Sequence, residues 1–364
     1  MEKAGILTFH RASNYGAALQ AFALQKTIEN LGYRSEIIDY RSHAIEIAHN
    51  PLYFDKKYGV KGILAAPIKI IKFRIFSEFR KKHLRLSKRV DTRTIGNIIS
   101  DYSVLITGSD QVWNGYISGQ DVNYFLPFKS PVNKYSYAAS LGDSYDTSWT
   151  KDILAKFGTG FSTISLREES AKEFVSDVTG KECRIDIDPT LLLSKNEWLE
   201  IAQKPKISDP YILIYTLALT TDIIQAAKEM SIKTGMKIVY LSNSFSRDRD
   251  IRKTRFSTPE EFVGWLSEAD YIFTNSFHGT AFSIIMNKPF FISKNAILGV
   301  NKRSADLIRL LEIEDRVISE KNDINHVRPI DWTKTNFLLS KNVRNAKDYI
   351  VSMFCDEVPR SDHE

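Results

Sequence analysis

Residues 268–289 constrain the fold of this chain more than any other segment. An apolar strand at residues 271–274 runs into a short polar loop, which carries His278 and opens an amphipathic helix. A loop at the carboxyl end of a strand presents small residues, free backbone N–H groups and a titratable ring together, which suits an anionic ligand on an open α/β sheet. The segment therefore predicts an α/β protein with an anion site at this strand end.

Strand and helix patterns alternate along the rest of the chain, which favours mostly parallel sheets covered on both faces. A polar segment with two prolines, residues 194–210, interrupts the alternation. Because 364 residues exceed the roughly 250–300 that one core supports, two domains are expected. We predict two doubly wound, Rossmann-like domains facing a cleft, residues 1–195 and 208–330, with a helix at 334–354 packing back on the first. The expected strands are 4–9, 35–40, 103–107, 134–139, 161–166, 211–217, 237–241 and 271–274; the expected helices are 17–30, 168–178, 222–233, 258–267 and 334–354.

Three observations limit the compartment and the chemistry. The apolar run at the start is too short for the central region of a signal peptide, and no run approaches the roughly 18 apolar residues of a membrane span. Cys183 and Cys355 are the two cysteines and show no metal-binding or disulfide spacing. We expect a cytoplasmic protein without a metal site.

Basic residues concentrate in residues 56–93, which hold 13 Lys and Arg against Glu78 and Asp91. At helical spacing, Ile68, Ile71, Ile75, Phe76 and Phe79 fall near one face. The helix either packs on its own domain with a solvated basic face, or contacts an anionic surface at the inner face of the membrane or a lipid-linked acidic substrate. Nucleic acid is disfavoured, because the chain has no zinc-finger, RNP-type or GXXG motif.

The loop after the first strand carries Asn14, Tyr15 and Gly16 just before a helix. Gly16 permits close backbone approach, and a helix N-terminus favours an anion or a sugar hydroxyl. The pattern is neither GxGxxG nor a P-loop, so it gives little support to dinucleotide binding. A structural strand-to-helix turn would look similar, and both interpretations stay open.

Residues 108–114, GSDQVWN, form a denser polar loop after a buried-type strand. Asp110 is suited to activating a sugar hydroxyl, and Trp113 to stacking on a pyranose ring. Gln111 and Asn114 add two amides for an acceptor sugar. The alternative is an Asx-type turn with Trp113 in the core.

Two further strand ends carry cations or a proton carrier. Arg167 follows a strand directly, and its planar fork suits a carboxylate or phosphate; a surface pair with Glu168 or Glu169 is the alternative. His278 is a candidate general acid. Further candidate donor-binding groups are Ser276, Gly279 and Thr280 beside His278, and Lys302 and Arg303 downstream of this segment.

Seven segments stand in a characteristic order between residues 5 and 291: NYGAALQAFALQ, LGYRSEIIDY, ITGSDQVWN, YAASLG, SLREESAKEF, DIDPTLLL and ADYIFTNSFHGTAFSIIMNKPFF. The ordered set resembles the polysaccharide pyruvyl transferase family. The resemblance implies a GT-B-like fold, with the donor held by basic residues and a histidine at the domain interface. It implies transfer of a pyruvyl group from phosphoenolpyruvate to a sugar, as a cyclic ketal. The sugar belongs to a surface polysaccharide, exopolysaccharide or capsule, or to its lipid-linked precursor.

In this resemblance the family's strand-end arginine corresponds to Arg167, its histidine to His278, and its later basic residue to Arg303 or Lys302. Phosphoenolpyruvate is a co-substrate, and no cofactor is implied. Many members read Arg-Leu-His at residues 276–278, where this chain reads Ser-Phe-His, so one cation expected near the donor is absent.

The expected reaction requires different roles of the candidate site residues. Phosphoenolpyruvate carries a carboxylate and a phosphate, so its site needs several cations or helix N-termini. We expect His278 to protonate the methylene carbon and Asp110 to assist deprotonation of the attacking hydroxyl. Two alternatives remain: a GT-B glycosyltransferase that uses a nucleotide sugar, and a non-catalytic carbohydrate-binding protein of a polysaccharide pathway.

Overall fold

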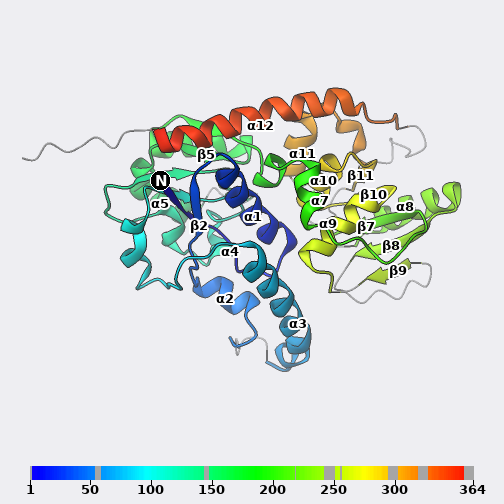
Figure 1. Ribbon diagram of the computed structural model, residues 1–364, viewed down its shortest axis with the longest axis horizontal. Coiled ribbons are helices and arrows are strands. Elements are labelled where there is room, and N and C mark those ends of the chain that lie inside the picture. The colour runs from blue at the N-terminus through cyan, green and yellow to red at the C-terminus, as the bar shows by residue number, and fades with distance from the viewer. Residues whose placement is uncertain are drawn as a thin grey trace, which may run out of the picture. The chain divides into compact units, whose positions relative to one another are not determined.

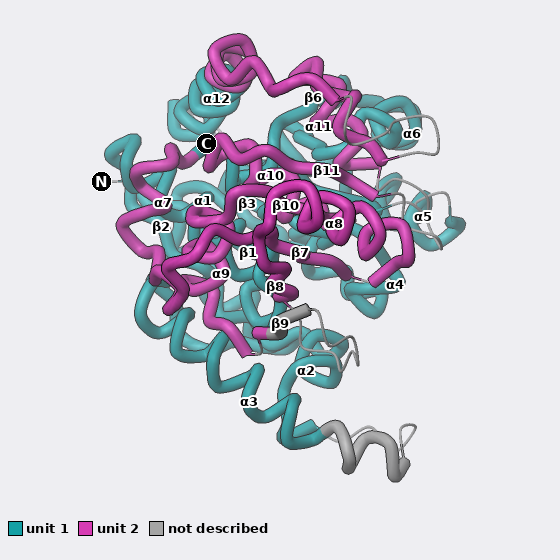
Figure 2. The backbone as a smooth tube through the Cα atoms, turned by 90° about the vertical axis from the view of Figure 1, so that its right-hand side faces the viewer, with its two compact units in different colours: residues 1–192, 342–364 teal, residues 193–341 magenta. Residues whose placement is uncertain are grey.

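The computed structural model describes residues 2–53, 59–142, 147–217, 219–241, 251–254, 256–293, 302–318 and 327–355; the side chains of 59–65 and 251–253 fall outside this description. The chain divides into two compact units (Figure 2). Unit 1 comprises Met1–Leu192 with Asn342–Glu364, and unit 2 comprises Leu193–Lys341. Both units are α/β with parallel sheets (Figure 1), as the strand and helix pattern predicts.

In the described part of unit 1, a four-stranded parallel sheet has the order β2-β1-β3-β4. Isolated bridges from Tyr135 to Thr163 and from Ala139 to Leu166 carry the pairing on to the short parallel pair β5-β6. The elements of this unit are β1 Lys3–Leu7, α1 Tyr15–Asn30, β2 Arg34–Ile37, α2 His43–His49, α3 Gly59–His83, η2 Ile95–Asp101, β3 Val104–Thr107, α4 Gly115–Ser118, η3 Val122–Phe125, β4 Asn133–Ser136, α5 Ser148–Phe157, η4 Gly158–Gly160, β5 Ile164–Leu166, η5 Glu169–Ala171, α6 Lys172–Thr179, β6 Cys183–Ile185 and η6 Pro189–Leu192.

Local signals explain where these elements begin and end. All four residues of β3 are buried, as expected for a parallel strand covered on both faces. Asn14 caps α1 by accepting from the backbone N–H groups of Gly16 and Ala17. The same helix stops at Gly32, whose φ of +91° lies in the left-handed region that favours glycine.

Helix α3 is the basic segment, and its described second half packs on unit 1. Phe76 and Phe79 are buried, with ring centroids 5.4 Å from Tyr15 and 6.2 Å from Phe22 of α1. Ile71 is 39% exposed, so the face on which the sequence pattern places it is only partly buried. Residues 56–58, and the side chains of 59–65, belong to the predicted membrane-contact segment but lie outside the described residues.

In the described part of unit 2, a five-stranded parallel sheet has the order β11-β10-β7-β8-β9. A capping box of Thr258 and Glu261 opens α9, where a helix is expected from the sequence. The elements are α7 Lys195–Ile201, β7 Tyr211–Tyr215, α8 Thr221–Thr234, β8 Lys237–Leu241, β9 Ile251–Thr254, α9 Pro259–Glu268, β10 Tyr271–Thr274, α10 Phe277–Ile285, β11 Phe290–Ile292, α11 Lys302–Leu310 and η7 Glu314–Arg316.

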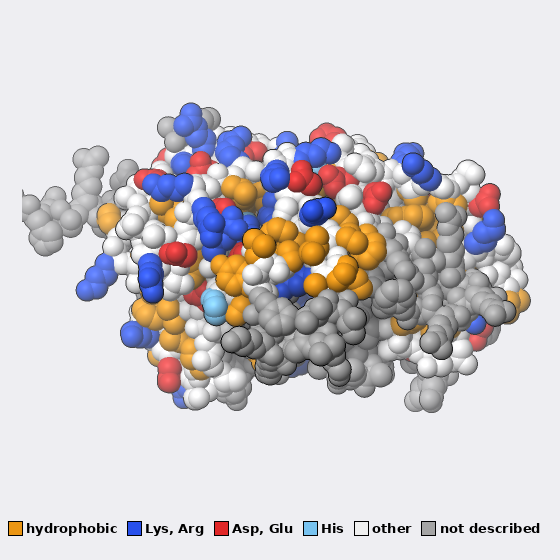
Figure 3. Space-filling model, turned by 90° about the horizontal axis from the view of Figure 1, so that it is seen from below, with side chains coloured by type: hydrophobic (Ala, Val, Ile, Leu, Met, Phe, Trp, Pro, Cys, Tyr) orange, Lys and Arg blue, Asp and Glu red, His pale blue; other side chains and the backbone are white. Residues whose placement is uncertain are grey.

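The last helix, α12 Trp332–Cys355, begins in unit 2 and ends in unit 1. Its unit 1 portion is fixed by Tyr349, whose hydroxyl donates to the carbonyl of Ser136 at 2.9 Å. The Arg184 guanidinium lies 3.9 Å from the Tyr349 ring centroid, at cation–π distance. Among the described helices, none combines the length and hydropathy needed to cross a bilayer. On the face in Figure 3, basic and acidic side chains are interspersed around a patch of hydrophobic ones.

Candidate functional site

Polar side chains of unit 1 meet at the carboxyl ends of β3, β4 and β5. Beyond the regular strands, isolated bridges pair Asp110 with Ala139 and Ala139 with Leu166. The backbone N–H of Arg167 also donates to the carbonyl of Ala139 at 3.2 Å. The three strand ends therefore bring Asp110 and Arg167 together, at the edge where open α/β sheets bind ligands.

Arg167 is buried and fixed by a carboxylate that the sequence did not single out. Its Nη1 donates to Oδ2 of Asp188 at 2.6 Å, and its Nη2 lies 3.7 Å from Oδ1 of Asp110. Asp188 is itself buried, and its Oδ1 accepts from the N–H and hydroxyl of Thr190 at 2.9 and 2.7 Å. Ser109 donates to the other oxygen at 3.3 Å. The alternative of a surface pair with Glu168 or Glu169 is therefore wrong.

Asp110 has a backbone conformation that few non-glycine residues adopt, with φ of +80°. Its carbonyl accepts from Ser140 N–H at 3.0 Å, and its Oδ1 accepts from Gln111 N–H at 2.8 Å. These bonds hold the loop while its carboxylate faces Arg167. Strain of this kind is often found at functional positions.

Glu168 is a second buried acid that sequence reasoning passed over as a surface residue. It is 1% exposed, and its Oε1 accepts from the Ser140 hydroxyl at 2.8 Å and from the N–H groups of Leu141 and Gly142 at 2.8 and 2.9 Å. Three donors on one carboxylate oxygen fix the loop after β4. No sequence pattern signals this contact, because its partners lie 26–28 residues away.

Trp113 is a core residue, so the prediction that it stacks on a pyranose is wrong. It has no exposed area, its ring stacks on Phe125 at 5.2 Å, and the Phe161 ring meets it edge-on at 5.6 Å. Its Nε1 donates to the carbonyl of Tyr124 at 2.9 Å. Tyr116, three residues later in α4, is 97% exposed and has the open aromatic face that Trp113 lacks.

The side-chain amides of Gln111 and Asn114 hold the loop in its conformation. Asn114 caps α4 through its oxygen and donates from its nitrogen to the Gln111 oxygen at 3.0 Å. Gly142, with φ of +75°, packs on both: a Cβ there would lie 2.5 Å from the Asn114 nitrogen and from the Gln111 oxygen. Because the Gln111 side-chain oxygen accepts from Asn114, its NH₂ group is the part of this amide that is suited to a sugar hydroxyl.

The loop before α1 is partly a structural turn. Asn14 is exposed, but its side-chain oxygen caps the helix, and Tyr15 packs on Phe76 of α3. Gly16 is buried, and its N–H donates to Asn14 at 2.8 Å. Because that first-turn N–H is already satisfied within the chain, this helix start offers less to an anion than the sequence suggests.

In unit 2, His278 lies in the first turn of α10 rather than in the loop before it. Ser276 is the N-cap, Phe277 begins the helix, and His278 is 9% exposed. Asn275, at the end of β10, accepts from the N–H of Leu217 at 2.9 Å and so ties this strand end to that of β7.

The hydroxyls and the glycine beside His278 are engaged in packing. The Thr280 hydroxyl donates to the Ser276 carbonyl at 3.2 Å, and Thr280 has no exposed area. A Cβ on Gly279 would lie 2.1 Å from Oγ1 of Thr274, so glycine is needed for α10 to approach β10. The prediction that the Thr280 hydroxyl cradles phosphate is therefore wrong.

Arg303 lies beside this turn, whereas Lys302 is exposed. The Arg303 guanidinium is 5.8 Å from the Phe277 ring centroid, which places a cation next to the residue that precedes His278. The structure thus brings Arg303 and His278 to the same part of unit 2. Among the described residues, no group of three or more His, Cys, Asp and Glu side chains is arranged to hold a metal ion.

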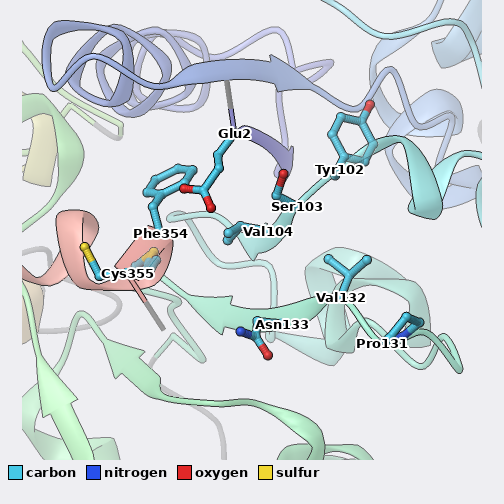
Figure 4. Close-up of a pocket in the computed structure, with 10 residues that line it drawn as sticks. Glu2, Tyr102, Ser103, Val104, Pro131, Val132, Asn133, Phe354 and Cys355 are labelled. Atoms are coloured by element: carbon cyan, nitrogen blue, oxygen red, sulfur yellow. The ribbon is translucent and has the colours of Figure 1, made fainter. Parts of the chain in front are cut away.

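A cavity of about 380 Å³ opens at the opposite edge of the unit 1 sheet (Figure 4). Its lining includes Glu2, Ser103 and Asn133 at the amino ends of β1, β3 and β4, together with Phe354 and Cys355 of α12. Ligands of open α/β sheets bind at the carboxyl ends, so this cavity is not the candidate site.

Comparison with known proteins identifies a family and a fold. The family described as polysaccharide pyruvyl transferase matches residues 14–295. Among curated proteins, none matches the sequence. Structures with a similar fold include the UDP-GlcNAc 2-epimerase from Neisseria meningitidis bound to UDP-GlcNAc, with a TM-score of 0.52, 9% identity and coverage of 98% of this chain and 100% of that one.

Two further structures are similar. S. aureus MnaA with UDP has a TM-score of 0.53 at 11% identity, covering 97% of this chain and 96% of that one. The Methanocaldococcus jannaschii UDP-GlcNAc 2-epimerase in complex with UDP-GlcNAc and UDP has a TM-score of 0.52 at 14% identity, covering 98% and 99%. At these identities the likeness shows the fold alone, which is the predicted GT-B-like α/β architecture of two Rossmann-like units.

Proposed function

The chain belongs to the polysaccharide pyruvyl transferase family, and from that premise we propose that it transfers a pyruvyl group from phosphoenolpyruvate to a sugar as a cyclic ketal. The acceptor sugar belongs to a surface polysaccharide, such as an exopolysaccharide or capsule, or to its lipid-linked precursor. Family membership is the observation that carries the proposal, because the matched segment contains Asp110, Arg167 and His278.

The charge of the donor sets the requirement for binding. Phosphoenolpyruvate carries a carboxylate and a phosphate, and the phosphate has about −1.5 to −2 charges near neutral pH. We assign donor binding to Arg167 of unit 1 and to Lys302, Arg303 and the first turn of α10 in unit 2. The Arg167 guanidinium is already held in place before any ligand arrives, since it contacts Asp188 and Asp110.

The reaction proceeds without oxidation or reduction. His278 delivers a proton to the methylene carbon, and a sugar hydroxyl attacks the electrophilic C2 as Asp110 takes its proton. The C2–O bond to phosphate then breaks, the oxygen of a second hydroxyl bonds to C2 and closes the ketal, and the proton of that hydroxyl leaves with the phosphate. General acid or base catalysis of each kind contributes typically about 10² to 10⁴-fold.

Acceptor binding is assigned to the loop between β3 and α4 and to the loop before α1. The NH₂ group of Gln111 and the exposed face of Tyr116 offer one donor and one stacking surface. Asn14, exposed at the other loop, contributes its NH₂ group.

The test is incubation with phosphoenolpyruvate and galactose- or mannose-type acceptors, followed by mass analysis. The expected product carries the mass of the acceptor plus phosphoenolpyruvate less phosphoric acid. UDP-, GDP- and CMP-sugars are offered in parallel, and sugar transfer from one of them without ketal formation contradicts the proposal. Acceptor binding with no phosphate release points instead to a carbohydrate-binding protein.

The proposed role of His278 has its own test. We expect His278→Ala to lower phosphate release from phosphoenolpyruvate plus acceptor by about 10² to 10⁴-fold. The same substitution at His43, an exposed histidine of α2, serves as the control. Turnover of His278→Ala near that of the unsubstituted protein removes this residue from the mechanism.

A further inference from the structure

A cluster of three arginines lies in unit 1, outside the residues assigned above, and we call it the guanidinium cluster. Arg11 follows β1, Arg41 follows β2 and Arg80 lies near the end of α3. Two carboxylates, Asp39 and Glu46, accompany them. Four of these five residues are buried, and the Arg41 side chain is 21% exposed.

Arg11 and Arg41 form ion pairs with both carboxylates. Asp39 contacts Arg41 at 2.9 Å and Arg11 at 3.6 Å. Glu46 bonds to Nε of Arg11 and lies 3.9 Å from Arg41. Each carboxylate is thus shared between the same two guanidinium groups.

Arg80 is the third guanidinium, and it has no carboxylate within ion-pair distance among the described residues. It is 3% exposed, and its Nη2 donates to the hydroxyl of Ser77 at 2.7 Å. Within the described chain, Nη1 of Arg80 and Nε of Arg41 are buried without a hydrogen-bond partner. A buried charge costs several kcal/mol unless an opposite charge compensates it.

The electrostatic surroundings are positive. Burial, Arg11 and Arg41 lower the pKa of Arg80 to about 10, against the opposing effect of Asp39 and Glu46. His49, in α2, has its pKa lowered to about 4 by burial and then by Lys69, Lys72 and Arg80. Arg11 and Arg41 pair with the two carboxylates, and Arg80 adds a third positive charge nearby. Protonation of the neighbouring His10 would only add to the excess.

We propose that the guanidinium cluster binds an oxyanion of the phosphate class. Such an anion accepts from Nη1 of Arg80 and Nε of Arg41 and neutralises the uncompensated guanidinium. Arginine suits this ligand, because its guanidinium stays charged and makes strong, charge-assisted hydrogen bonds to phosphate oxygens. The phosphate is either free or part of a phosphorylated sugar.

The first experiment measures binding of inorganic phosphate by calorimetry, at constant ionic strength kept with chloride. Arg80→Met is expected to weaken binding about tenfold or more, since a hydrogen bond to a charged group contributes about 1.5–3 kcal/mol. Arg74→Met, at an exposed arginine of the same helix, should leave binding unchanged. Equal binding to the Arg80→Met and Arg74→Met proteins overturns the proposal.

Stability separates an anion site from a structural arginine. Without phosphate, Arg80→Met is expected to unfold at the same or a higher urea concentration than the unsubstituted protein, because it removes an uncompensated buried charge. With phosphate, only the unsubstituted protein should gain stability. Strong destabilisation by Arg80→Met without phosphate, with the phosphate-induced gain retained, shows a purely structural role and overturns the proposal.

Phosphate is also the product of the proposed reaction, so the two phosphate sites must be distinguished. Arg167→Met is expected to retain binding at the guanidinium cluster; loss of all phosphate binding in this variant overturns the proposal but leaves the proposed function standing. An independent readout needs no variant, since phosphate at the cluster should raise the pKa of His49 in an NMR titration. Absence of that rise also contradicts the site.

The source of the phosphate is settled by comparing inorganic phosphate with a hexose 1-phosphate. Tighter binding of the hexose 1-phosphate, lost in Arg80→Met, assigns the site to a phosphorylated sugar. Equal affinities assign it to free phosphate. Binding of neither probe at millimolar concentration overturns the proposal.

Discussion

Asp188 determines how Arg167 can act, because it accepts the 2.6 Å hydrogen bond that fixes the guanidinium. Asp188→Asn keeps the shape of the side chain and removes its charge. We expect this change to raise the KM for phosphoenolpyruvate more than the KM for the acceptor, since Asp188 positions a donor-binding residue. Steady-state kinetics with each substrate varied in turn provides the measurement.

The control for this prediction is Asp186→Asn. Asp186 is another buried aspartate on the same segment, but it pairs with Arg184 at 2.6 Å rather than with Arg167. A general loss of stability would affect both variants and both KM values. Equal changes in the two KM values for Asp188→Asn would therefore show that Asp188 serves the fold rather than the donor.

Trp113 and Tyr116 are three residues apart, and we expect opposite consequences from replacing them. Trp113→Ala empties a fully buried site and should cost about 3–5 kcal/mol of unfolding free energy. Tyr116→Ala removes an exposed ring and should leave stability within about 0.5 kcal/mol while raising the KM for the acceptor. Urea denaturation and acceptor kinetics measure the two effects; an unchanged acceptor KM in Tyr116→Ala excludes the stacking role.

At the scale of elements, the helices and strands with strong local signals were predictable from sequence. The buried runs that form β3 and β7 and the capping box of Thr258 before α9 are local features, so a short window contains them. The sequence pattern predicts a polar break at residues 194–210, yet α7 begins there at Lys195. Its capping box of Ser194 and Glu197 and its buried Trp198 were available as signals.

The contacts that shape the candidate site could not be predicted in this way. Asp188 meets Ser109 across 79 residues, and Trp113 is enclosed by aromatic rings from η3 and from the segment before β5. Periodicity indicates which face of an element is apolar, but not which distant loop covers it. Sequence therefore located the strand ends that carry Asp110, Arg167 and His278, but not their partners.

Helix α3 gives a prediction at this scale, because its exposed side includes Ile70 and Ile71, each 39% exposed, beside basic residues. We propose that residues 56–93 contact an anionic membrane at its inner face, with the hydrophobic side chains entering the interface. Ile70→Glu with Ile71→Glu should then reduce sedimentation with vesicles that contain phosphatidylglycerol. Vesicles of phosphatidylcholine alone are the control, and equal sedimentation with both lipids contradicts the contact.

At the scale of the whole molecule, the guanidinium cluster makes stability depend on pH. Burial alone would raise the pKa of Asp39, but His10, Arg41 and Arg11 outweigh it and hold the pKa well below its usual range. The pKa of Glu46 is also lowered, since bonds to Arg11 and Asn50 outweigh its burial. Both carboxylates therefore stabilise the fold above their unfolded pKa values of about 4, and this stabilisation is lost as the pH falls further.

His49 also makes the fold less stable as the pH falls, and it does so at higher pH than the carboxylates. Its folded pKa of about 4 lies below the ordinary histidine value of about 6.5. The folded state keeps the ring neutral while the unfolded chain takes up a proton. The contribution of His49 to stability is therefore fully present above about pH 6.5 and is lost as the pH falls towards 4. The shift corresponds to about 3 kcal/mol.

We expect urea midpoints to decrease between pH 7 and pH 4.5 in the unsubstituted protein and to change less in His49→Gln. His43→Gln, at an exposed position of the same helix, should keep the full decrease. If His49→Gln and His43→Gln show equal slopes, the pH dependence arises elsewhere, and the positive field assigned to Lys69, Lys72 and Arg80 does not act on this ring.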